Sequence, residues 1–121
     1  MQNRLERNEE QDTVDYMLDN YGIESIKQTF MGSRGWPDRI FLLPRRPAWI
    51  EFKKKGKKPR KLQIYRMEKL KSLGYDVTWT DNKNEAILWL EKIFASRLSN
   101  EGNNSDDKAG LRGTSARPRT G

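Results

Sequence analysis

The chain contains no cysteine and no histidine among its 121 residues. Without cysteine it can form neither disulfides nor thiolate metal sites. Without histidine it lacks a ligand of zinc fingers and of histidine-metal nucleases, and it lacks the commonest general acid–base side chain of enzymes. Any catalysis must therefore use carboxylates, lysine, tyrosine or hydroxyl groups, with a hard cation held by oxygen atoms.

Long apolar segments are also lacking. No run of apolar residues approaches the roughly 20 that a membrane-spanning helix needs. The first residues, MQNRLERNEEQD, contain no apolar signal region. We therefore expect a soluble, cytoplasmic protein with no membrane partner.

Positive charge is abundant and unevenly distributed. The net charge is +7, yet residues 34–71 alone hold 14 Lys and Arg against 3 Asp and Glu, which leaves the rest of the chain negative. A positive excess favours a polyanionic partner, either nucleic acid or an anionic membrane surface. The plainer alternative is a charged face that only keeps the chain in solution. The run KKKGKKPRK at 53–61 is too dense for that purpose alone, and it favours contacts with a phosphate backbone.

Apolar spacing and turn residues predict the element order α-β-β-β-α-β-α, with the first strand the weakest signal. This order predicts an α/β fold, a small mixed β-sheet flanked by helices. The second and third strands should be antiparallel, because the turn PRRP that joins them is so short. The predicted helices are 9–21, 60–73 and 83–98, and the predicted strands are 23–30, 39–43, 48–53 and 75–80.

The predicted helices each carry an apolar side, and together these should form one core. We assign residues 1–98 to a single domain. The remainder, 99–121, contains one large aliphatic residue and no aromatic one, so we expect a disordered polar tail. The inward-facing helix residues are predicted to be Val14, Met17, Leu18 and Tyr21; Leu62, Tyr65, Leu70 and Leu73; and Ile87, Leu90, Ile93 and Phe94.

Asp38 and Glu51 are the only acidic residues between Arg34 and Lys61. Because strand residues two apart share a face, Glu51 and Lys53 should point together, while the residues between them enter the core. Two carboxylates that converge in a positive field suit Mg²⁺ or Mn²⁺, because neighbouring cations keep them ionised. A nearby ammonium would stabilise the charge that develops during phosphodiester hydrolysis.

Each half of this pattern also has an ordinary interpretation. Pro-Asp is a common turn, and Glu-x-Lys is often an ion pair facing solvent. Their combination within sixteen residues, followed by a basic helix, is far more specific. The motif Gly35-x-Pro37-Asp38, then Glu51-x-Lys53, then Gln63 resembles the PD-(D/E)xK nuclease superfamily, and within it the VRR-NUC (virus-type replication-repair nuclease) group.

The resemblance covers about residues 10–90 and includes Lys27 and the pair Gly74-Tyr75. It implies a restriction-endonuclease-like core and a metal-dependent, structure-selective DNA endonuclease. The stand-alone form found in bacteria and phages is similar to Holliday-junction resolvases, which act as homodimers in DNA repair and recombination. We therefore expect branched DNA as the partner, Mg²⁺ or Mn²⁺ as the cofactor, and a bacterial cell or phage-infected host as the setting.

The resemblance also implies roles for individual residues. Asp38 and Glu51 would ligate the metal together with the carbonyl of Phe52, and Lys53 would be the catalytic lysine. Gln63 would lie near the metal or the scissile phosphate. Glu10 is the favoured helix carboxylate of the site, with Glu9 and Glu6 as competitors, and Trp36 departs from the small aliphatic residue usual in the family. The expected DNA-binding residues are Lys27, Arg34, Lys54, Lys55, Lys57, Lys58, Arg60 and Lys61.

Other functions remain compatible with the same residues. A flap-specific, nicking or restriction-like nuclease would keep the chemistry and change the substrate. A non-catalytic nucleic-acid-binding module would keep only the basic surface. Branched DNA is recognised by shape and phosphate contacts, so the sequence alone discriminates weakly among the nucleases.

Overall fold

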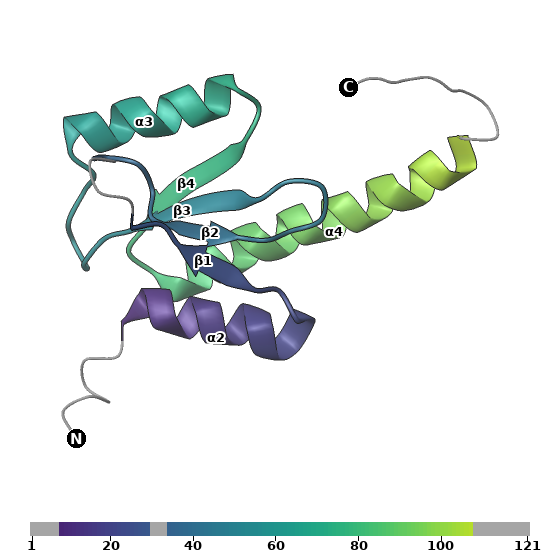
Figure 1. Cartoon of the computed structure of the whole chain (residues 1–121). Helices are drawn as coiled ribbons and strands as arrows, with labels where there is room; N and C mark the ends of the chain where they lie inside the picture. The colour runs from purple at the N-terminus through teal and green to yellow at the C-terminus, as the bar shows by residue number, and fades with distance from the viewer. Residues whose placement is uncertain (1–7, 30–33, 108–121) are drawn as a thin grey trace.

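The computed structural model describes residues 8–29 and 34–107, with side chains up to residue 99. Seven elements follow one another in the predicted order, so the α/β fold is confirmed (Figure 1). Residues 1–7, 30–33 and 108–121, including part of the predicted first strand, part of the glycine-rich loop and most of the predicted tail, lie outside the described part of the chain. The elements are α2 (Glu9–Tyr21), β1 (Ser25–Lys27), β2 (Arg39–Phe41), β3 (Ala48–Phe52), α3 (Lys61–Ser72), β4 (Asp76–Thr80) and α4 (Lys83–Asp107).

The four strands form one mixed sheet in the order β1-β2-β3-β4. β2 runs antiparallel to both β1 and β3, which confirms the predicted hairpin, and β4 runs parallel to β3. The parallel pairing is possible because α3 carries the chain back across the sheet between β3 and β4. β3 therefore lies inside the sheet, with a neighbour on each side.

Helices cover both faces of the sheet. Figure 1 shows α3 on one side and α2 on the other. The larger core lies against α2 and α4, where Met17, Phe41, Ile50 and Leu90 are fully buried. The smaller core lies under α3 and consists of Met67, Leu70 and Val77, with Trp36, Trp49 and Tyr75 packed around them. Successive residues of β3 alternate between these two cores, as strand geometry requires.

The inward faces of α2 and α3 differ from the prediction. In α2, Met17 is buried with Thr13, whereas Leu18 and Tyr21 are exposed. In α3 the buried residues are Gln63, Met67 and Leu70, whereas the predicted Leu62, Tyr65 and Leu73 face solvent. In α3 the difference has a polar cause. The helix is rotated so that the Gln63 amide hydrogen-bonds to Glu51 on β3, and this contact, rather than the spacing of apolar residues, sets the buried face.

Two element lengths also differ from the prediction. β1 is limited to three residues, because its partner β2 offers only three residues to pair with. α4 continues through residues 99–107, where a disordered tail was predicted. Extending an existing helix costs far less than starting one, and this segment contains no proline to stop it. No helix in the described ranges is long and apolar enough to cross a membrane.

Gly35 begins the loop that leads to Asp38, and its φ of +79° lies in the left-handed region. A Cβ there would stand 2.6 Å from Cγ of Leu62. Gly56 offers a matched control, because its φ is +83° and a Cβ there would meet open space. Both Gly→Ala substitutions should lose about 1–2 kcal/mol from backbone strain.

We predict that Gly35→Ala loses clearly more stability than Gly56→Ala in urea denaturation, because the Leu62 side chain must also move. Equal losses in the two variants would show that the contact between the loop and α3 has no energetic weight.

Candidate metal centre and nucleic-acid interface

The candidate site lies where β2 begins and β3 ends. Asp38 directly precedes β2, Glu51 is the penultimate residue of β3, and Lys53 directly follows it. Because these strands are antiparallel, with Arg39 opposite Ile50, the start of one lies beside the end of the other. The Gln28 amide donates a hydrogen bond of 2.6 Å to the Asp38 carbonyl, which holds the backbone there. The structure thus brings together the two carboxylates that the sequence singles out.

Glu51 points toward α3 and is 9% exposed. Burial, with smaller contributions from the neighbouring Asp38 and Glu10 carboxylates, raises the pKa of its carboxyl group to about 7. The Lys53 ammonium and the Asp38 backbone amide act in the opposite direction. The effect of burial thus exceeds that of the Lys53 ammonium, although Glu51 lies in the most basic part of the chain.

Asp38 is perturbed in the same sense. Burial raises the pKa of its carboxyl group, and the Glu10 carboxylate adds to the effect, while Lys27 and Arg39 oppose it. Two neighbouring carboxylates that resist ionisation would be stabilised by a divalent cation between them. Their oxygen atoms are the ligands that Mg²⁺ and Mn²⁺ prefer, so the residues present fit such an ion.

The side chain of Gln63 connects the parts of this site. Its amide nitrogen donates to the Glu51 carboxylate over 3.0 Å. Its amide oxygen accepts from the Lys53 ammonium over 3.2 Å and from the backbone N–H of Arg60 over 2.8 Å. The last bond satisfies a free N–H at the start of α3. One buried amide therefore fixes the carboxylate, the lysine and the helix relative to one another.

The two candidate helix carboxylates take different positions. Glu10 forms an ion pair of 2.8 Å with Arg39 and a longer one, 3.5 Å, with Lys27. Glu9 instead accepts a hydrogen bond of 2.7 Å from the backbone N–H of Lys83 at the start of α4. Glu10 is therefore the one that faces the site, and the third competitor, residue 6, lies outside the described part of the chain.

Glu10 does not complete a metal cage in this arrangement. Within residues 8–29 and 34–107, no group of three or more acidic side chains is placed to hold a metal ion. The Glu10 carboxylate is instead paired with the Arg39 guanidinium. Its negative charge nevertheless contributes to the raised pKa values of Asp38 and Glu51. Mg²⁺ is commonly bound through one or two carboxylates and keeps several waters, so a site formed by Asp38 and Glu51 alone would suit it.

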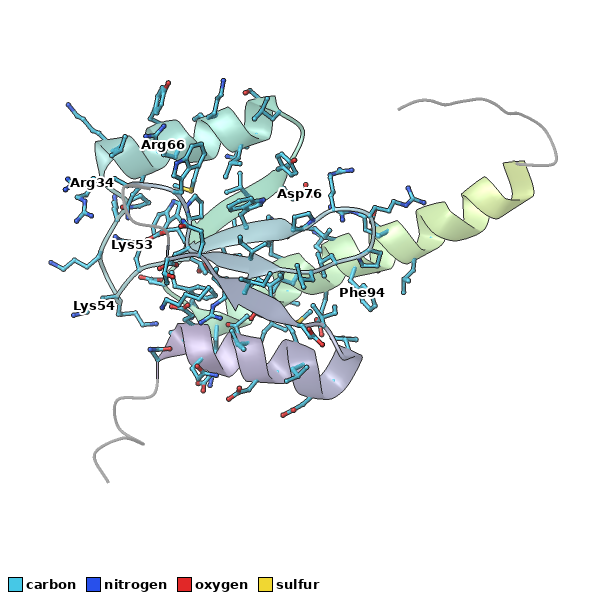
Figure 2. All side chains as sticks on the ribbon, viewed as in Figure 1. Arg34, Lys53, Lys54, Arg66, Asp76 and Phe94 are labelled. Atoms are coloured by element: carbon cyan, nitrogen blue, oxygen red, sulfur yellow. The ribbon has the colours of Figure 1, made fainter. Side chains whose placement is uncertain are left out.

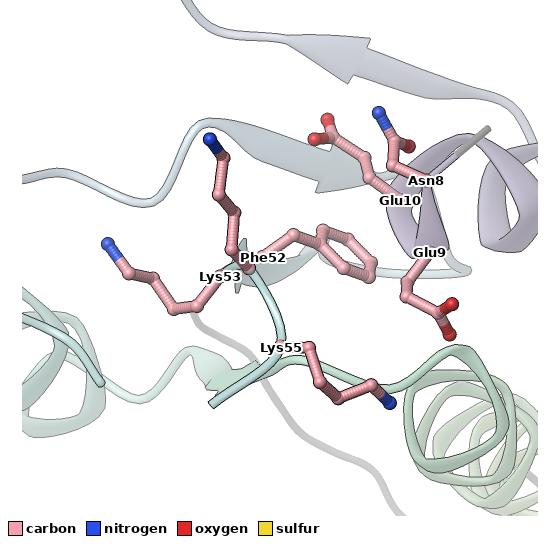
Figure 3. Close-up of a pocket in the computed structure, with 7 residues that line it drawn as sticks. Asn8, Glu9, Glu10, Phe52, Lys53 and Lys55 are labelled. Atoms are coloured by element: carbon pink, nitrogen blue, oxygen red, sulfur yellow. The ribbon is translucent and has the colours of Figure 1, made fainter. Parts of the chain in front are cut away.

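A pocket of about 350 Å³ opens between the start of α2 and the end of β3 (Figure 3), and neither Asp38 nor Glu51 is among its lining residues. Figure 3 shows Glu10 and Asn8, from the start of α2, on one side of Phe52, with Glu9 on the same helix. Phe52 lines the pocket at the end of β3, and its carbonyl as a metal ligand stays a prediction. The lining residues are Asn8, Glu9, Glu10, Phe52, Lys53, Lys54 and Lys55.

Basic residues surround the site on the side of α3. Figure 2 shows Arg34, Lys53 and Lys54 at the same end of the sheet. Two further pockets share Arg60: one of about 460 Å³ with Lys54, Lys57 and Lys58, and one of about 420 Å³ with Arg34 and Gln63. The structure thus places these predicted DNA-binding residues around the carboxylates. Of the others, Lys55 lines the pocket at β3, Lys61 is the first residue of α3, and Lys27 contacts Glu10.

Arg39 is a site residue that the sequence analysis missed. It is a largely buried cation that pairs with Glu10 and lies opposite Lys27 in the β1–β2 register. Its position directly after Asp38 was a usable signal, because a cation beside a metal-binding carboxylate tunes that carboxylate's charge. The pairing with Glu10 joins sequence positions 29 residues apart, and only the fold reveals it.

Comparison of the chain with protein-family models and with curated proteins found no match. The resemblance to VRR-NUC nucleases therefore depends on the motif residues alone.

The raised pKa of Glu51 predicts a distinctive pH dependence of stability. Between its ordinary pKa of 4.5 and the folded value of about 7, folded Glu51 keeps a proton that the unfolded chain has released. Stability should therefore fall as pH rises through this window. Glu51→Gln has no carboxyl group to ionise and avoids this loss. The stability of the variant relative to the wild type should therefore increase between pH 4.5 and 7.

Thermal unfolding of both proteins across this range, with and without Mn²⁺, measures the effect. Mn²⁺ should raise the melting temperature of the wild type at pH 8 and leave that of Glu51→Gln unchanged, because only the ionised carboxylate binds metal. A constant difference between the two proteins at every pH contradicts the shift.

Proposed function

We propose that the chain is a divalent-metal-dependent, structure-selective DNA endonuclease with a PD-(D/E)xK core of the VRR-NUC kind. The observation that carries the proposal is the half-buried Asp38 carboxylate beside the buried Glu51 carboxylate, which Gln63 links to Lys53. A structural ion pair would leave neither carboxyl pKa raised, because a matched cation would favour the ionised form. In this proposal a divalent cation supplies the positive charge that the two carboxylates lack.

The protein groups have separate tasks in this proposal. Asp38 and Glu51 would hold Mg²⁺ or Mn²⁺, with the Phe52 carbonyl as a further ligand. The bound ion would polarise a phosphoryl oxygen and supply hydroxide at neutral pH. Lys53 would donate hydrogen bonds to the negative charge that develops on the phosphate. Gln63 keeps the ammonium of Lys53 aimed, because its amide oxygen accepts one of the three N–H bonds.

Branched DNA is the substrate that we propose, with a Holliday junction as the leading form. The basic residues come from two sides of the site, the loop at Arg34 and the segment 54–61, so they can contact phosphates of more than one duplex arm. Flap, nicking or restriction-like cleavage on the same fold would use the same chemistry. A non-catalytic binding module would account for the basic surface and leave the buried carboxylates without a purpose.

Resolution of a four-way junction needs two symmetric cuts, and this chain supplies one Asp38–Glu51 pair. We therefore propose a homodimer with two-fold symmetry. Trp79 on the edge strand β4 and Tyr65 on α3 are exposed and provide apolar contact area. Sedimentation of the full chain should give a dimer with or without junction DNA. A monomer in both conditions that still makes paired symmetric cuts would contradict this assembly.

Incubation with Mg²⁺ or Mn²⁺ and labelled four-way junctions, flaps and linear duplexes tests the activity. The wild type should cut branched DNA and lose activity with a chelator. Asp38→Asn and Glu51→Gln should abolish cleavage and keep DNA binding, because each removes a negative ligand and leaves the basic surface intact. Wild-type cleavage rates in either variant would eliminate the proposed metal site.

Lys53 can be separated from its basic neighbours by kinetics. Lys53→Ala should slow turnover by a barrier increase of about 2–4 kcal/mol, the scale for one preorganised electrostatic contact. Lys55→Ala is the matched control, because Lys55 lines the same pocket and lies outside the motif. It should weaken binding and leave the turnover of bound DNA nearly unchanged. Equal turnover losses in the two variants would favour a general basic patch.

A further inference from the structure

A second basic pocket lies at the opposite end of the sheet. Figure 2 shows Asp76 there, away from Lys53 and Lys54 at the candidate metal centre. The pocket has a volume of about 420 Å³ and is formed by the β2–β3 turn, the start of β4 and one side of α4. Its lining includes Arg45, Arg46, Asp76, Trp89, Lys92 and Arg97.

The turn that carries two of these arginines is strained. The Arg46 amide donates to the Pro44 carbonyl over 2.9 Å, and the intervening Arg45 has a φ of +74°. This is a γ-turn of the rare kind, whose central residue sits in a region that glycine tolerates best. Pro47 further restricts Arg46 to extended conformations. An arginine kept where glycine would be easier points to a use for the side chain.

Arg97 holds this turn in place through hydrogen bonds to its backbone. It is 5% exposed and donates hydrogen bonds of 2.7 Å to the carbonyls of Pro44 and Arg46. It also pairs with Asp76, which lies 3.9 Å from the Arg46 guanidinium. Asp76 is the one carboxylate against four cations in the lining, so the pocket keeps a positive excess. The backbone of the exposed arginines is therefore held before any ligand arrives.

We propose that this arginine-turn pocket binds backbone phosphates of a second stretch of the nucleic acid that occupies the metal centre. The inference rests on the proposed function for the identity of the ligand. Guanidinium groups match phosphate oxygens in bidentate geometry, and a rigid turn lowers the entropy cost of the contact. Arg46 and Glu51 are five residue steps apart along the turn and β3, about 17 Å along an extended strand. That distance corresponds to about five base pairs of duplex.

The double variant Arg45→Gly with Lys92→Ala tests the pocket without threatening the fold. Glycine relieves the strained φ, so the melting temperature should stay equal or rise. The affinity for a 30-base-pair duplex, measured against salt concentration, should lose between one and two units of log–log slope, since each lost phosphate contact removes about 0.9. Lys69→Ala with Lys71→Ala removes the same charge from exposed positions on α3 and should change the slope clearly less.

Three outcomes separate this inference from the nuclease proposal. A normal duplex affinity and slope in the Arg45→Gly, Lys92→Ala variant overturns the pocket and leaves the nuclease standing. Equal slope changes in the two double variants also overturn it, because a general field would then explain the binding. Wild-type protein that binds neither this duplex nor a four-way junction at any salt concentration overturns both. Titration with pyrophosphate, followed by NMR at the amides of Arg45, Arg46 and Ser96, should give shifts that the first variant loses.

Discussion

The hydrogen bonds of the Gln63 side chain are the contact on which the arrangement of this protein depends. They join β3 to the first turn of α3 and fix Glu51 and Lys53 in one orientation. They also explain why α3 turns apolar residues such as Tyr65 to solvent, since burying the Gln63 amide at the sheet sets the rotation of the helix. A buried amide is tolerated only when its polar atoms are paired, and both the oxygen and the nitrogen of Gln63 are.

The folded protein disfavours the ionised form of the two site carboxylates, Asp38 and Glu51. Burial and neighbouring carboxylates raise the pKa values of Asp38 and Glu51, while the surrounding lysines lie mostly in solvent. Such an arrangement lowers stability near neutral pH, and a bound divalent cation would offset this loss. Arg45, at the other end of the sheet, is likewise in an unfavourable state, because its φ is positive. Such local strain persists where the surrounding structure enforces it.

Local patterns predict most of the fold. Helix α2 begins and ends where apolar spacing and Gly22 place it, and the PRRP turn gives the antiparallel hairpin. Adjacent motif residues were likewise predictable, because strand periodicity puts Glu51 and Lys53 on one face. What the sequence missed were features set by long-range contacts: the rotation of α3 and the pairing of Glu10 with Arg39. Each depends on residues distant in sequence, and periodicity carries no information about them.

The location of a bound cation tests the central claim most directly. Crystals soaked in Mn²⁺ and measured at the manganese absorption edge would locate it by anomalous scattering. The account predicts one ion between the carboxylates of Asp38 and Glu51, absent from crystals of Glu51→Gln. Manganese bound elsewhere, or a peak between these residues that persists in Glu51→Gln, would contradict it.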